Sequence, residues 1–263
     1  MQKLLLVLPF ALAACAGGTT DVTEGSSDEA ALSRKCGGAD RVYGFDVSLH
    51  QGTVDWTKVG TARIQGQAPV FAAARVSDGT YTMDGPIFAR NWRGMKAAGL
   101  VRGAYQFFRP EQDAHAQARV FIQALEAAGG FEPGIDLPPA VDIEVVEARY
   151  THAVVSNAKI QAGVKLWLED VEAALHVRPI VYSLAGVSYA LGDAFSEYPL
   201  WIANFYQSCP RMPTGWTDWQ IDQYDDKGKI PGVTGYADLN SFNGDREAFE
   251  EFVLASARPT ATN

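Results

Sequence analysis

The chain has 263 residues, of which 47% are hydrophobic and 11% aromatic, enough to bury the core of one large domain. Its formal net charge is -9, with 22 Lys and Arg against 31 Asp and Glu. A protein that binds nucleic acid electrostatically presents a basic face, so this charge argues against that class, and we expect no nucleic-acid partner.

The first 14 residues have the layout of a secretory signal. One early lysine precedes an apolar stretch that is too short to span a bilayer, and small residues follow it. The run Leu12-Ala13-Ala14-Cys15 resembles the bacterial lipobox, in which the cysteine is acylated. We therefore predict an exported protein of the cell envelope, anchored in a lipid bilayer through Cys15, at the outer membrane or the periplasmic face. An ordinary secretory signal with an incidental cysteine is the alternative.

Residues 15–40 are rich in Gly, Thr, Ser and acids, so we expect a flexible tether there. The globular domain is expected over residues 41–258, with a short tail at 259–263. If Cys15 carries lipid, Cys36 and Cys209 remain as a pair in an oxidising compartment, and we predict a disulfide between them. Two buried free thiols are the alternative.

Short apolar strands alternate with amphipathic helical stretches through the rest of the chain, a pattern typical of an α/β domain with a largely parallel sheet. The predicted strands are 41–47, 70–76, 102–107, 140–145, 179–183, 200–205, 218–224 and 236–242. The predicted helices are 87–98, 114–128, 156–175 and 246–256. Little room is left for long helices between the last three strands, so we expect a barrel that is irregular in its second half.

The fourth strand delivers two acids. Successive side chains of an extended strand point to opposite faces, so Asp142 and Glu144 share one face. Two carboxyls held close together cannot both ionise freely, so one of them can act as an acid near neutral pH, as glycoside hydrolysis requires. The alternative is that both acids simply belong to the solvated side of an edge strand.

Further polar and aromatic residues follow the other strands, at the end of a parallel barrel where catalytic groups gather. They are the acids Asp46 and Asp238, the aromatic residues Tyr105, Tyr182, Trp201 and Tyr224, and the amides Asn204, Gln223 and Asn240. Sugars bind on aromatic rings flanked by Asn, Gln and Asp, which hold the hydroxyls. Any single aromatic residue can equally belong to the core, and Asp46 and Asp238 can equally be turn residues. The histidines show no metal-ligand spacing, so we expect no metal and no cofactor.

The run from Tyr43 to Trp56, YGFDVSLHQGTVDW, resembles the first strand of family 25 of the glycoside hydrolases, the lysozyme-like muramidases. Matching segments follow in the expected order. They are Phe88–Trp92, Ala97–Leu100, Gly103–Pro110, Leu137–Glu144, Leu200–Ala203, Gln223-Tyr224, Gly232-Val233 and Ala237–Gly244. The similarity spans about residues 42–245, and the ordered set is much more specific than any one segment.

This resemblance implies an α/β fold, an irregular TIM-like barrel of the form (β/α)5(β)3. It also implies cleavage of the β-1,4 bond between N-acetylmuramic acid and N-acetylglucosamine in the glycan strands of peptidoglycan. By the same resemblance Glu144 is the proton donor and Asp142 assists through the substrate's acetamido group. Asp46 and Asp238 match two further acids of the pocket, and the enzyme is expected to be a monomer.

Two departures and two alternatives remain. Gln106 stands where many relatives have histidine, and the run from Val76 to Gly79 replaces a common Ala-Thr-Glu-Gly, which affects the expected substrate preference rather than the four acids. The alternatives are a barrel that binds cell-wall glycan without cleaving it, and a hydrolase of another N-acetylhexosamine polymer such as chitin.

Overall fold

The computed structural model describes residues 33–257. The predicted signal peptide, the lipid-bearing Cys15, most of the predicted tether and the tail at 259–263 lie outside the described residues.

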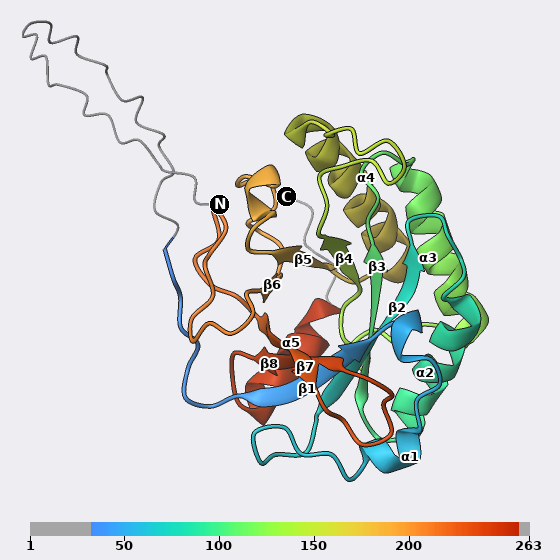
Figure 1. The fold of residues 1–263 in the computed structure, drawn as a ribbon, viewed down its shortest axis with the longest axis vertical. Helices are drawn as coiled ribbons and strands as arrows, with labels where there is room; N and C mark the ends of the chain where they lie inside the picture. The colour runs from blue at the N-terminus through green and yellow to red at the C-terminus, as the bar shows by residue number, and fades with distance from the viewer. Residues whose placement is uncertain (1–32, 258–263) are drawn as a thin grey trace, which may run out of the picture. The chain divides into compact units, whose positions relative to one another are not determined.

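Eight strands form a closed barrel in chain order (Figure 1). The strands are β1 (Val42–Val47), β2 (Phe71–Asp78), β3 (Val101–Phe107), β4 (Ala140–Ile143), β5 (Ile180–Leu184), β6 (Leu200–Ala203), β7 (Ile221–Gly228) and β8 (Ala237–Phe242). Neighbours from β1 to β7 are parallel, and β8 closes the barrel antiparallel to both β7 and β1. The predicted irregular α/β barrel is thus confirmed. The expected seventh strand, 218–224, was placed too early, because residues 221–228 form it.

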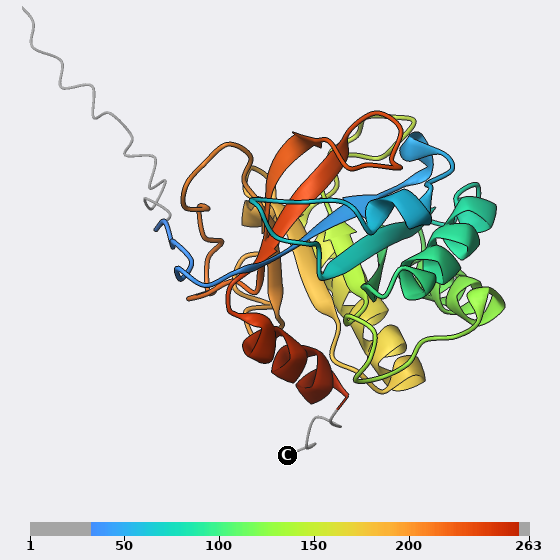
Figure 2. The ribbon, with the colours of Figure 1, turned by 90° about the horizontal axis from the view of Figure 1, so that it is seen from below.

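Between residues 33 and 257 the chain forms five α-helices, most of them on the first half of the barrel. They are α1 (Trp56–Val59), α2 (Gly85–Ala97), α3 (Ala114–Ala128), α4 (Asn157–Leu175) and α5 (Arg246–Ser256). Helices α2, α3 and α4 lie side by side, and α5 lies apart from them (Figures 1 and 2). The unit after β5 carries only the 3-10 helix η2 (Ser188–Ala190), so the fifth helix of the expected pattern is reduced to one turn.

Capping side chains fix where the longer helices begin. The carboxylates of Asp113 and Asp245 accept hydrogen bonds from the backbone of the first turns of α3 and α5, at 2.6 and 2.9 Å. Gly129 ends α3 in the left-handed conformation, with φ of 117°, which glycine adopts without a steric cost. These caps set the length of the helices and so return the chain to the correct end of the next strand.

Strand alternation divides the core into two layers. Val141 and Ile143 face outward into the layer between the barrel and the helices, whereas Ala140 faces the barrel interior. One end of the interior is closed by aromatic rings, with Phe249 of α5 stacked on Phe71 at a centroid distance of 5.3 Å. Because that end is filled, the opposite end of the barrel is left for a pocket.

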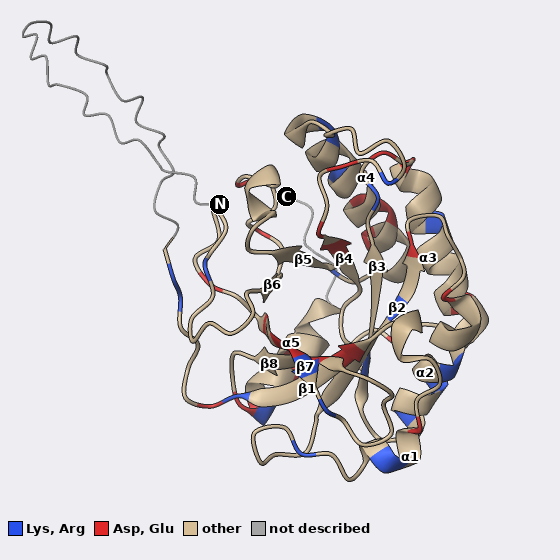
Figure 3. Cartoon of the chain, viewed as in Figure 1, with Lys and Arg blue, Asp and Glu red and all other residues tan. Residues whose placement is uncertain are grey.

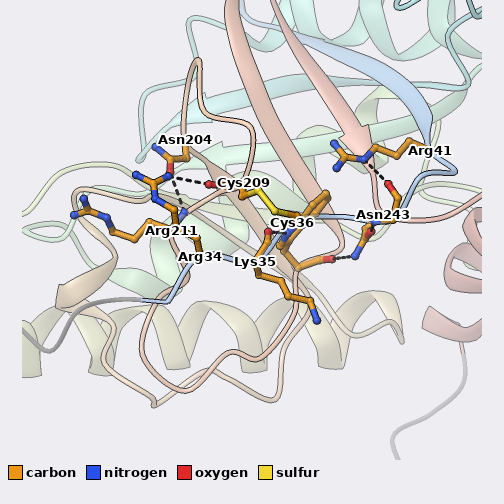
Figure 4. Close-up of a disulfide and its surroundings, with 10 residues drawn as sticks. Arg34, Lys35, Cys36, Arg41, Asn204, Cys209, Arg211 and Asn243 are labelled. Carbon is orange, nitrogen blue, oxygen red and sulfur yellow. Dashed lines mark hydrogen bonds between the residues drawn. A yellow bond between two sulfur atoms is a disulfide. The ribbon is translucent and has the colours of Figure 1, made fainter.

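The segment just before β1 is held against the domain rather than free. Cys36 is bonded to Cys209, the backbone N–H of Lys35 donates to the carbonyl of Pro210 at 3.1 Å, and Trp219 donates to the carbonyl of Lys35 at 2.9 Å (Figure 4). Within the described residues, therefore, the expected tether is wrong from residue 33 onward, because these contacts hold the chain in place. No helix between residues 33 and 257 is both long and apolar enough to cross a bilayer.

Candidate active site

A pocket of about 280 Å³ opens at the end of the barrel to which β1–β6 point. Its lining residues come from seven of the eight strands or from the residue that follows one: Asp46, Tyr105, Asp142, Glu144, Tyr182, Trp201, Gln223 and Asp238. Asp238 reaches the same end because β8 runs antiparallel to β1, where Asp46 and Asp238 are register partners. Figure 3 shows acidic residues at the ends of β1 and β4. The four acids predicted from distant parts of the chain therefore meet in one pocket.

Asp46 is held by two amide side chains. Its Oδ2 accepts hydrogen bonds from Gln223 Nε2 and Asn240 Nδ2, both at 2.8 Å. Each amide is fixed in turn, because Asn240 Oδ1 accepts from Trp201 Nε1 at 2.8 Å and Gln223 Oε1 accepts from the Tyr182 hydroxyl at 2.7 Å. This network orients Tyr182 and Trp201 in the pocket wall.

Burial raises the pKa values of the carboxyls in this pocket. Burial raises the pKa of Asp46 from 3.8 to about 6, against the lowering effect of its two amide donors. Burial, together with the negative charges of Asp46 and Glu144, raises the pKa of Asp238 from 3.8 to about 8. The pocket therefore retains protons at neutral pH that exposed acids would have lost.

Asp142 and Glu144 are neighbouring carboxyls that both hold their protons more tightly than exposed acids do. Burial, then the charge of Glu144, raises the pKa of Asp142 well above 3.8, and burial also raises the pKa of Glu144. The Arg75 charge lowers both pKa values and so partly offsets these rises. Asp142 Oδ1 is buried and has no hydrogen-bond partner among the described residues. It is an acceptor left for a donor on the ligand.

Arg75 is a cation close to the pocket that the sequence analysis missed. A β-bulge at Val76 lies between the Arg75–Tyr105 and Ser77–Gln106 register pairs of β2 and β3. Arg75 Nε donates to Asp84 Oδ1 at 3.1 Å, and the Arg75 charge partly opposes the rise that burial causes in the pKa values of Asp142 and Glu144. Strand alternation from Phe71 was the signal that could have found it, since Phe71 and Ala73 face inward.

The chain segments at and after the carboxyl ends of β2, β3 and β4 are tied together at the end of the barrel that carries the pocket. Asp78 pairs with Arg109 at 2.5 Å and with Arg149 at 3.0 Å. The hydroxyls of Tyr81 and Tyr150 lie 2.5 Å apart, which ties the loop after β4 to the loop after β2. These contacts hold the three segments to one another beside the carboxyl ends of the strands.

Three predicted substrate-binding residues do not line the pocket. Asn204 Oδ1 instead accepts from the backbone N–H of Arg211 at 2.9 Å, near the disulfide (Figure 4). Tyr224 points to the outside of β7, and Asn240 lies behind Asp46 as a supporting residue. Gln106 is fully buried on the outer side, where it bonds to Ser77 and Trp167, so this departure from the family pattern does not touch the pocket.

The arrangement suits proton transfer to a sugar held against aromatic rings. Tyr105, Tyr182 and Trp201 supply those rings, with the Tyr182 and Trp201 centroids 5.4 Å apart at an interplanar angle of 88°. Across residues 33–257, no three His, Cys, Asp or Glu side chains are placed to hold a metal ion together.

Comparison with known proteins points in the same direction. Residues 45–233 match the model of the family described as glycosyl hydrolases family 25. The chain is 34% identical over 213 residues to the protein YegX of Escherichia coli strain K12, covering 81% of this chain and 73% of YegX. It is 30% identical over 212 residues to Lysozyme M1 of Streptomyces globisporus, covering 77% of this chain and 68% of the lysozyme.

Among solved structures, the lysozyme of Streptomyces coelicolor superposes with a TM-score of 0.71 at 27% identity, covering 84% of this chain and 100% of the lysozyme. The muramidase of Acremonium alcalophilum gives a TM-score of 0.67 at 27% identity, covering 82% of this chain and 100% of the muramidase. With its barrel, its pocket of four acids and these matches, the chain belongs to family 25 of the glycoside hydrolases.

Proposed function

We propose that this glycoside hydrolase is a muramidase, which cleaves the β-1,4 bond between N-acetylmuramic acid and N-acetylglucosamine in peptidoglycan. The similarity to a lysozyme and a muramidase supports this substrate. The observation that carries the proposal is the buried, unpartnered Oδ1 of Asp142 beside Glu144 in the pocket. An acetamido N–H of the sugar is a donor of the kind that this oxygen lacks.

Glu144 acts as the proton donor in this proposal. When the sugar enters, the acetamido N–H donates to Asp142, which favours the ionised form of Asp142 and leaves the proton of the pair on Glu144. The acetamido oxygen then attacks the anomeric carbon while Glu144 protonates the departing glycosidic oxygen. Water subsequently attacks the anomeric carbon, with Glu144 accepting its proton, so the pair returns to its starting state. Such substrate assistance is a known exception to the two-carboxylate nucleophile scheme.

The remaining residues of the pocket hold the sugar and set the charge. Tyr182 and Trp201 form the apolar wall against which a pyranose face packs, and their orientation depends on the Asp46 network. Asp46 and Asp238 add acceptors for hydroxyls while remaining partly protonated near neutral pH, since the pKa values are about 6 and about 8.

The identity of the new reducing ends tests the proposed bond. Purified peptidoglycan is digested, the ends are reduced with borohydride, and the products are identified by mass spectrometry. Reduced N-acetylmuramic acid is the expected product, and Glu144→Gln serves as the inactive control. Reduced N-acetylglucosamine at every new end would contradict muramidase specificity, and cleavage of chitin oligosaccharides alone would favour the chitin alternative.

We also propose that the chain is exported and held at the envelope by an acylated Cys15. The bond between Cys36 and Cys209 supports export, because such bonds persist in oxidising compartments. Incorporation of labelled palmitate is expected in the wild type and not in Cys15→Ala. Equal labelling of the two proteins would overturn the anchor.

A further inference from the structure

A second hollow lies on the outer face of the barrel, away from the pocket of four acids. Its volume is about 400 Å³ including its open mouth, and it is lined by Arg41, Tyr43, Gln65, Gln207, Ser208, Asp222 and Tyr224. Alternation along β7 separates the two sites, because Gln223 points into the active-site pocket while Asp222 and Tyr224 point outward. No step of the proposed reaction uses these outward residues.

The floor of the hollow contains buried polar atoms that lack partners. Asp222 is 2% exposed, and its Oδ1 accepts no hydrogen bond from any described residue. Ser241 is the register partner of Asp222 on β8 and also has an unpartnered Oγ, but it is fully buried and does not line the hollow. Gln65 lies near the Tyr224 hydroxyl without completing a hydrogen bond to it. Buried polar groups are normally paired, so Asp222 Oδ1 and the Tyr224 hydroxyl, which belong to lining residues, point to a ligand that pairs with them.

The lining selects the class of that ligand. The lining holds one cation, Arg41, and one acid, Asp222, whose pKa of about 7 leaves it partly ionised near neutral pH, so the net charge of these two side chains stays below one unit and favours no strongly charged ligand. The side chains of Gln65, Gln207 and Ser208 both donate and accept hydrogen bonds. The rings of Tyr43 and Tyr224, 6.4 Å apart and nearly perpendicular, add an apolar surface. Amides, a carboxyl and tyrosine rings together suit a neutral ligand rich in hydroxyls.

The protonation state of the Asp222 carboxyl also suits a neutral ligand. Burial raises the pKa of Asp222 from 3.8 to about 7, and the Arg41 charge opposes this rise. Near neutral pH the carboxyl is therefore partly protonated and can both donate a hydrogen bond to a hydroxyl and accept one from it.

We propose that this hollow is a second, non-catalytic binding site for one sugar residue. The site holds a glycan on the outside of the barrel while another part of the polymer occupies the active-site pocket. Two linked contacts of this kind raise the affinity for a long polymer that reaches both sites. The affinity for a short glycan that reaches only one site is unchanged. The identification of the sugar as part of peptidoglycan rests on the proposed function. The existence of the site does not depend on that function.

The test measures binding separately from turnover. In the full chain carrying Glu144→Gln, binding to insoluble peptidoglycan is measured by co-sedimentation, with and without Asp222→Leu. We expect Asp222→Leu to weaken this binding about tenfold. The double variant Gln207→Ala with Ser208→Ala removes only loop side chains, so it tests the site without disturbing the barrel, and we expect a similar loss. Gln123→Ala, on the exposed face of α3, is the matched control and should bind normally.

In the active background, the same variants should cleave a soluble glycan too short to reach both sites with unchanged kcat/KM. Titration of the ¹⁵N-labelled protein with N-acetylglucosamine trisaccharide should shift the amide signals of Gln65 and Gln207, whether or not the chain cleaves peptidoglycan. Unchanged co-sedimentation of both variants, or signals that move with methylammonium and not with the trisaccharide, would overturn the proposal. Failure of the wild type to cleave peptidoglycan would refute the proposed function alone.

Discussion

Replacing Asp222 with asparagine should stabilise the protein at alkaline pH. The carboxyl is buried without a partner for Oδ1, and burial raises its pKa from 3.8 to about 7. An acid whose pKa is higher in the folded state than in the unfolded state contributes stability that is fully present below the unfolded pKa. This stability is lost as pH rises through the folded pKa. The full rise from 3.8 to about 7 corresponds to about 4 kcal/mol of unfolding free energy lost by pH 8. The amide introduced by Asp222→Asn has nearly the same shape and no charge to bury, so the variant should avoid most of this loss.

Urea unfolding at pH 4 and pH 8 measures the effect. The advantage of Asp222→Asn over the wild type should be small at pH 4 and grow to a few kcal/mol, about 4 at most, by pH 8. Asp55→Asn is a control of opposite sign, since hydrogen bonds and charge from Lys58 lower the pKa of this exposed acid. That variant should lose stability at neutral pH, and the loss should shrink as pH falls. Equal unfolding free energies for Asp222→Asn and the wild type at pH 8 would refute the reasoning.

Two further predictions concern the supports of the site. Asn240→Leu removes a donor to Asp46 and leaves Trp201 Nε1 buried without an acceptor, so it should lower the unfolding free energy in urea by about 3 kcal/mol. The control Asn204→Ala should lower it much less. An equally small loss for Asn240→Leu would show that the network does not stabilise the fold. Replacing both Cys36 and Cys209 by Ser removes a disulfide between residues 173 apart in the sequence, which in the chain-entropy model stabilises the fold by about 5 kcal/mol at most. The melting temperature should therefore fall, and an unchanged melting temperature would contradict this prediction.

Strand alternation accounts for both the success and the errors of the sequence-based site. It correctly put Asp142 and Glu144 on one face, because β4 is regular up to its end. The same rule argues against Tyr224, since its neighbour Gln223 points into the pocket. The sequence analysis assigned both Gln223 and Tyr224 to the pocket. The expected strand 218–224 did not match β7, which begins at residue 221, so it did not show which of the two side chains faces inward.

Other parts of the site depend on contacts that a sequence does not display. The bulge at Val76 changes the register just after Arg75, and no local signal in the run from Val76 to Gly79 marks it. Similarly, Asn204 is drawn to the backbone of Arg211 near the bond between Cys36 and Cys209, which joins distant parts of the chain. Polarity and spacing found the four acids, but tertiary packing decided which of their neighbours reach the ligand.

The rate at which Glu144→Gln releases reducing ends from purified peptidoglycan is the most direct test of the central claim, that Glu144 protonates the leaving oxygen. Glutamine keeps the shape of the side chain and removes the proton, so the account predicts a loss of ~10² to 10⁴ or more relative to the wild type. Asp142→Asn, measured beside it, should lose less. A Glu144→Gln variant that turned over at the wild-type rate would contradict the account.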